Sequence, residues 1–89
     1  MTNDILTNDQ KINLDYLNEF YKSKSKVHIR LLRTDNSGNN IFFNCVIKEK
    51  LSETMFIIND RILGDIKISL FEIKENGVSE FRGDNNGKY

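Results

Sequence analysis

Proline and tryptophan are absent from this chain of 89 residues, and cysteine and histidine occur once each. The single cysteine, Cys45, excludes an internal disulfide and suits a reducing compartment. Thirteen basic residues balance thirteen acidic ones, so bulk charge provides no drive for non-specific binding to nucleic acid. These absences predict an intracellular protein, cytoplasmic or nuclear, with no disulfide framework.

Long apolar segments are missing as well. No run approaches the roughly 20 apolar residues that span a bilayer, and the first four residues lack the positive charge of a signal peptide. No membrane association is therefore expected. A chain of this length has room for one hydrophobic core, which predicts a single domain over residues 1–89.

Catalytic and metal-binding motifs are equally scarce. His28 has no cysteine or histidine close by in sequence, and no glycine-rich phosphate loop occurs. Asp60 and Asp65 flank a turn, where turn chemistry explains them without acid–base catalysis. Cys45 lies in an apolar run, which favours a small buried side chain over a nucleophile. We therefore expect no enzyme, no cofactor and no metal site.

The N-terminal part of the chain has a helical pattern. Residues Thr7 to Gln10 have the form of a capping box, in which the Thr7 hydroxyl and the Gln10 side chain each bond the other's backbone amide. Apolar residues follow at helical spacing at Ile12, Leu14, Tyr16, Leu17, Phe20 and Tyr21. The pattern predicts a helix over residues 8–23, with Ile12, Tyr16, Leu17 and Phe20 facing the rest of the domain.

After residue 26 the apolar period changes to two, which is typical of half-buried strands. The alternation and the intervening turn residues predict strands over 26–33, 41–48, 54–59, 65–70 and 78–82, followed by a flexible polar tail over 83–89. Short consecutive strands commonly curl into a small barrel, which reduces their exposed edges. The predicted fold class is mostly β, with an N-terminal helix before a small five-stranded barrel.

The order of one helix and five strands, over about residues 10–83, resembles the Sm-like, SH3-like small barrels. Residues 16–20 leading into 27–32 resemble the entry from the helix into the first strand of Hfq, and 68–73 resemble the family's fourth strand and closing turn. Residues 55–81 are similar in layout to the second half of Gemin-type Sm-like subunits of the survival-motor-neuron complex.

The chain departs from RNA-binding members of that family at three places. Those members usually have a glycine within strand two, an Asp…Asn pattern before strand three, and an Arg-Gly pair or the Tyr-Lys-His of Hfq after strand four. Here the corresponding segments are residues 42–46, 50–54 and 70–72, which lack these residues. The resemblance thus implies no RNA-pocket residue. It implies a non-catalytic Sm-like interaction subunit that assists assembly of a ribonucleoprotein of the spliceosomal snRNP type by pairing with another Sm-like protein.

Unpaired backbone groups at the edges of a sheet also predict pairing with another chain. An open five-stranded barrel leaves N–H and C=O groups unpaired on its last strands. A neighbouring chain, of the same or another Sm-like protein, can add a strand there and bury apolar area worth about 25 cal/mol per Å². The expected partner-binding edge consists of Ile66, Ile68, Leu70, Val78 and Phe81.

Basic residues are spread over several predicted strands. Candidate RNA contacts, if folding brings them to one face with Phe42 or Tyr21, are His28, Arg30, Arg33, Lys48, Arg61 and Lys67. Acidic residues lie among them, which favours solvated strand faces over an RNA site. Two alternative functions remain open: an Hfq-like RNA-binding regulator that forms a homo-oligomeric ring, and a mobile-element accessory protein that inhibits a host complex.

Overall fold

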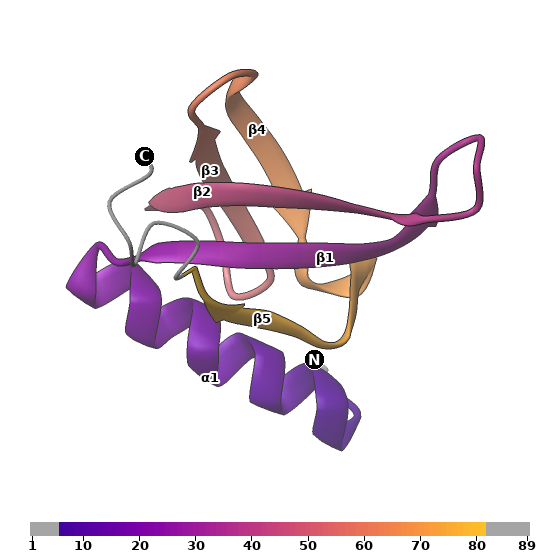
Figure 1. Cartoon of the computed structure of the whole chain (residues 1–89). Helices are drawn as coiled ribbons and strands as arrows, with labels where there is room; N and C mark the ends of the chain where they lie inside the picture. The colour runs from indigo at the N-terminus through magenta and orange to yellow at the C-terminus, as the bar shows by residue number, and fades with distance from the viewer. Residues whose placement is uncertain (1–5, 82–89) are drawn as a thin grey trace.

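The computed structural model describes residues 6–81 as one helix and five strands (Figure 1). In chain order these are α1 (Asn8–Ser23), β1 (Lys26–Thr34), β2 (Asn40–Lys50), β3 (Met55–Asp60), β4 (Gly64–Ser69), the short 3₁₀ helix η1 (Leu70–Glu72) and β5 (Ile73–Glu80). The predicted helix and the mostly-β class are confirmed, and the first four strands lie within two residues of their predicted bounds. The predicted tail over 83–89, like residue 82, lies outside the described residues.

The prediction for the last strand was wrong at its start, because β5 begins at Ile73 and not at residue 78. The strand contains an irregularity where it pairs with β1: Ile29 lies opposite Val78, but Leu31 lies opposite Ile73. Asn76 has a positive φ of 57° inside this irregularity. A residue pair Asn76-Gly77 is typical of a turn, and here it forms a bulge within a continuous strand.

The five strands form one antiparallel sheet in the order β4-β3-β2-β1-β5. Its two edge strands are joined only by η1. Four strand spacings of about 4.8 Å would make a flat sheet roughly 19 Å wide, whereas the four peptide steps from Ser69 to Ile73 reach at most about 14 Å. The sheet must therefore curl, and in Figure 1 the β3–β4 hairpin rises steeply across the direction of β1 and β2. Among the described residues β4 and β5 do not pair, so the barrel-like sheet stays open.

The curl encloses one apolar core, to which every strand and α1 contribute. Alternate residues of β1 and β2 point into this core. The long strand β2 bends with the curled sheet at a register shift between Ile47 and Glu49, and it does so without a glycine. The fully buried side chains include Leu17, Val27, Ile29, Leu31, Ile47, Phe56, Ile58 and Leu70.

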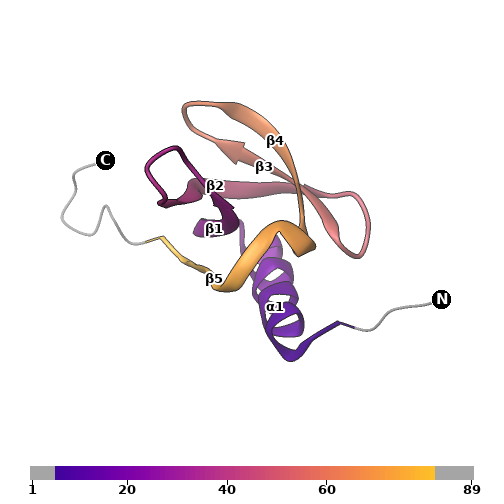
Figure 2. The same cartoon turned by 90° about the vertical axis from the view of Figure 1, so that its right-hand side faces the viewer.

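Helix α1 packs mainly on β5 and β2 (Figures 1 and 2). Its inward stripe differs from the predicted one. Leu17 is fully buried and Phe20 packs against the core, as expected, but Ile12 and Tyr16 are 43% and 47% exposed. The centre of the inward stripe is instead the polar Asn13, which is 1% exposed and whose amide bonds the backbone of β5.

Candidate functional site

The two edges of the sheet are the first candidate site. The backbone amide of Leu70 donates to the carbonyl oxygen of Thr54 at 2.7 Å, next to the register pair Phe56–Ile68. In an antiparallel ladder, residues alternate between bonding the neighbouring strand and facing away from it. The backbone groups of Lys67 therefore face away from β3, and within residues 6–81 no other strand pairs with that side of β4.

The other edge is β5. The Phe81 amide donates to the Lys26 carbonyl oxygen at 3.0 Å, so the same alternation turns the backbone of Val78 away from β1. The sheet thus ends in one β4 edge and one β5 edge, each pairing on one side only within the part of the chain that the structure describes.

Of the five residues predicted for partner binding, three are core residues: Ile68, Leu70 and Val78 are at most 4% exposed. Their side chains hold the chain's own core together, so only their backbone could take part in pairing. Ile66 is half-buried against the core, and Phe81 lines a pocket on the other face of the sheet. The five do not form one surface, because three are buried in the core and Phe81 lies on the other face of the sheet.

The second candidate site is the face of the sheet turned away from the core. On β1 and β2 it is built from three register pairs: Lys26 with Val46, His28 with Asn44, and Arg30 with Phe42. The residues between them, such as Ile29 and Cys45, point into the core. Strand alternation therefore places cationic, amide and aromatic side chains side by side on this outer face.

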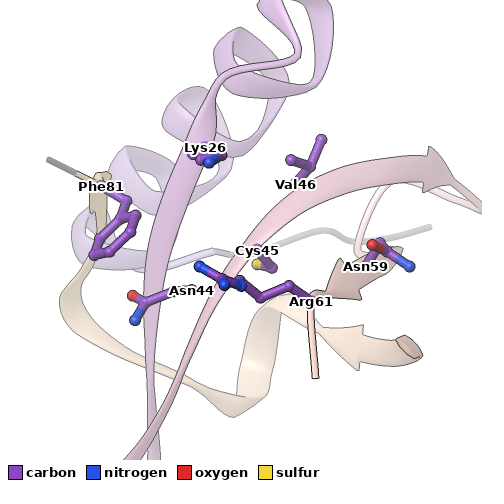
Figure 3. Close-up of a pocket in the computed structure, with 7 residues that line it drawn as sticks. All are labelled: Lys26, Asn44, Cys45, Val46, Asn59, Arg61 and Phe81. Atoms are coloured by element: carbon purple, nitrogen blue, oxygen red, sulfur yellow. The ribbon is translucent and has the colours of Figure 1, made fainter. Parts of the chain in front are cut away.

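Three open pockets lie along the outer face. We call these three pockets together the outer-face groove. The largest, about 480 Å³, is lined by Lys26, Asn44, Cys45, Val46, Asn59, Arg61 and Phe81 (Figure 3). A second of about 350 Å³ is lined by Phe42, Asn44, Asp60, Arg61 and Ile62, and a third of about 350 Å³ by Arg30, Gly38, Asn39, Asn40 and Phe42. Neighbouring pockets share lining residues, so the three adjoin one another along this face.

Phe42 is the central aromatic residue of this groove, and its side chain is held in place. The His28 ring lies 4.9 Å from the Phe42 ring, centroid to centroid, at a tilt of 32°. His28 Nδ1–H in turn donates to Asn44 Oδ1 at 2.7 Å. Phe42 nevertheless stays 52% exposed. The Phe42 ring thus contacts the His28 ring and is still about half open to solvent.

The carboxylates near the groove are already bonded within the chain. Lys48 Nζ donates to Asp65 at 2.6 Å and Asn59 Nδ2 donates to it at 2.9 Å; these two bonds, that of Lys48 foremost, lower the Asp65 pKa. The bond to Asp65 likewise raises the pKa of Lys48. Asp60 Oδ1 accepts the backbone amides of Ile62 and Leu63 at 2.8 and 2.9 Å, which fixes the turn between β3 and β4.

The fold brings only part of the predicted RNA-contact set together. His28 packs on Phe42, and Arg30 and Arg61 line the groove. The other three lie outside the lining: Lys48 is paired with Asp65, Lys67 is exposed on β4, and Arg33 Nη2 lies 3.8 Å from Glu72 in η1. Lining residues outside the predicted RNA-contact set include Lys26, Asn44, Asn59 and Phe81, of which Phe81 was predicted for the partner-binding edge. Because side chains alternate along the first two strands, Lys26 and Asn44 could have been assigned to this face from the sequence.

Cys45 is one of the residues that line the largest of these pockets (Figure 3) but is only 4% exposed, as predicted for a small buried side chain. Burial, followed by the negative charge of Asp60, raises the pKa of its thiol to about 12. Such a thiol is not a nucleophile near neutral pH. Residues 6–81 contain no group of three or more His, Cys, Asp or Glu side chains placed to hold a metal ion.

In comparisons with known proteins, no family model, no curated protein and no solved structure matches this chain. In the described residues, α1 falls short of the length and apolar character that crossing a membrane requires.

Proposed function

We propose that this chain is a non-catalytic, Sm-like interaction subunit that joins its sheet edge to edge with a second Sm-like chain and so assists assembly of a ribonucleoprotein complex. The observation that carries the proposal is the strand order, which ends in one β4 edge and one β5 edge. The β4 edge of one chain and the β5 edge of the next can complete each other's ladders.

Two further features support the proposal. The short η1 between β4 and β5 occupies the place of the closing turn on which the resemblance rests. The Lys67 backbone faces away from β3, and its own side chain is exposed, so a neighbouring strand can approach without disturbing the core. Sheet edges left open in this way are sites where natural proteins add a strand from a partner.

The test uses a proline on the open side of β4. Lys67→Pro removes a backbone N–H that faces the edge and leaves the bonds between β3 and β4 in place, because proline is tolerated at such edge positions. Lys67→Ala is the matched control, since it removes the same side chain and keeps the N–H. Light scattering after size-exclusion chromatography measures the assembly state of each, alone and mixed with Sm-like proteins.

We expect the natural chain and Lys67→Ala to associate equally, and Lys67→Pro to be a folded monomer by circular dichroism and scattering mass. A natural chain that stays monomeric and binds no Sm-like protein would overturn the proposal. So would a Lys67→Pro variant that associates as well as Lys67→Ala.

A further inference from the structure

We propose that the outer-face groove binds a single-stranded nucleic acid, with a base stacked on Phe42 and the backbone phosphates beside Arg30, Arg61 and Lys26. The groove lies within one chain, on the outer side of β1, β2 and β3. This inference therefore does not depend on edge pairing.

The first argument is the extent of the groove. The third and second pockets share Phe42, and the second and first share Asn44 and Arg61. Three linked pockets in a row suit an extended polymer better than a compact ligand, which would occupy one of them. A mononucleotide is thus the less favoured occupant, although it carries the same chemistry.

The second argument is the charge of the lining. Three cationic side chains line the groove, at Lys26, Arg30 and Arg61. Among the described residues that line the three pockets, the only carboxylate is that of Asp60, and its Oδ1 already accepts two backbone amides. Each of the three pockets thus has at least one cationic side chain in its lining, which suits a phosphate backbone.

The third argument is the aromatic and amide content. Base stacking on an exposed aromatic ring is the sequence-tolerant contact used by proteins that bind single strands. Phe42 is 52% exposed and held by the His28 ring, so stacking would require little ordering of the protein. Asn44 and Asn59 line the adjoining pocket (Figure 3). Asn44 Oδ1 is bonded to His28 and Asn59 Nδ2 to Asp65, so the groups that would bond base edges are Asn44 Nδ2 and Asn59 Oδ1.

The binding test uses fluorescence anisotropy with labelled ten-nucleotide strands, rU10, rA10 and dT10, at low salt, and the four ribonucleoside monophosphates as competitors. Phe42→Ala and Phe42→Leu remove the stacking ring, the second while keeping an apolar side chain. Phe71→Ala is the matched control, because Phe71 is also 52% exposed but lines none of the three pockets. Arg30→Ala is paired with Arg33→Ala, whose arginine lies beside Glu72.

We expect at least one ten-nucleotide strand to bind, with affinity reduced about 5- to 100-fold by both Phe42 variants, as for the loss of one stacked base. Phe71→Ala and Arg33→Ala should bind like the natural chain. Arg30→Ala should also reduce the slope of log affinity against log salt by about one unit. The monomeric Lys67→Pro variant should bind as well as the natural chain, which separates this proposal from edge pairing.

Three results would overturn the inference. The first is that no strand binds to the natural chain at low salt. The second is that Phe42→Leu, folded by circular dichroism, binds as well as Phe71→Ala. The third is that monophosphates compete as well as unlabelled ten-nucleotide strands, which would reassign the groove to a free nucleotide.

Discussion

The side-chain amide of Asn13, in the middle of α1, donates a hydrogen bond to the backbone carbonyl oxygen of Lys74 in β5 at 3.0 Å. This bond joins the helix to the irregular part of the last strand, and the Asn13 Oδ1 atom is buried without a partner among the described residues. A buried polar group at a helix–strand contact costs desolvation unless it is bonded. The bond therefore matters more to the docking of α1 than an average side-chain contact.

Asn13→Ala is expected to lower the free energy of unfolding by about 1 kcal/mol, because the Lys74 carbonyl is left without its donor while the burial cost of the orphan oxygen is relieved. Asn8→Ala, an exposed asparagine on the same helix, should change it by less than about 0.5 kcal/mol. Urea denaturation measures both. Equal stability of the two variants would contradict the role given to this bond.

Gly77→Ala is expected to destabilise the fold by about 1–3 kcal/mol through overpacking. A Cβ atom there would lie 2.6 Å from the Lys74 carbonyl oxygen and 2.7 Å from the Arg30 carbonyl oxygen, both fixed backbone atoms. Gly38→Ala is the control, since nothing lies within 4 Å of its Cβ and only the positive φ of 87° opposes the change. Thermal unfolding should show the larger loss at Gly77; a larger loss at Gly38 would contradict the close approach.

Cys45 predicts a dependence of stability on alkaline pH. Burial raises its pKa from 9.0 to about 12 in the folded chain, so the unfolded chain loses the proton first as the pH rises. The stability contribution of the protonated thiol is complete below about pH 9 and is lost progressively up to about pH 12. Between pH 8 and 10.5 the natural chain should lose about 2 kcal/mol more than Cys45→Ala. Equal losses in denaturation at the two pH values would show that the folded thiol titrates normally.

The capping box at the start of α1 gives a further prediction. Thr7 Oγ1 accepts the Gln10 amide at 3.1 Å, and Gln10 Oε1 accepts the Thr7 amide at 2.9 Å. Thr7→Ala should cost about 1 kcal/mol of stability, as for loss of a helix N-cap. Thr7→Ser keeps the acceptor and should be close to the natural chain in urea denaturation. A Thr7→Ser loss as large as that of Thr7→Ala would refute the capping role.

The helix bounds could be predicted because the capping signal is local to Thr7 and Gln10. The face of the helix could not, since apolar residues cover more than half of its circumference and the inward position is the polar Asn13. That position is set by a carbonyl group far along the chain, at Lys74. No periodicity within the helix contains this information.

The outer-face groove was predictable only in part, for a similar reason. Alternation along the first strand identifies His28 and Arg30 as sharing a face. That Arg61 and Phe81 lie beside them depends on the order of strands across the sheet, with β3 on one side of the hairpin and β5 on the other. The order of strands depends on the whole fold, so the alternation within single strands could not predict it.

The position of β5 beside β1 also has a consequence for synthesis on the ribosome. Strands β2, β3 and β4 each pair with the strand before them, so this meander can form as the chain emerges. Ile29 in β1 can pair with Val78 only after β5 has been synthesised. Helix α1 also lacks its main packing surface until β5 is present. A nascent chain ending before Ile73 is therefore expected to expose an unpaired β1 edge and the apolar side of α1 together, which favours aggregation.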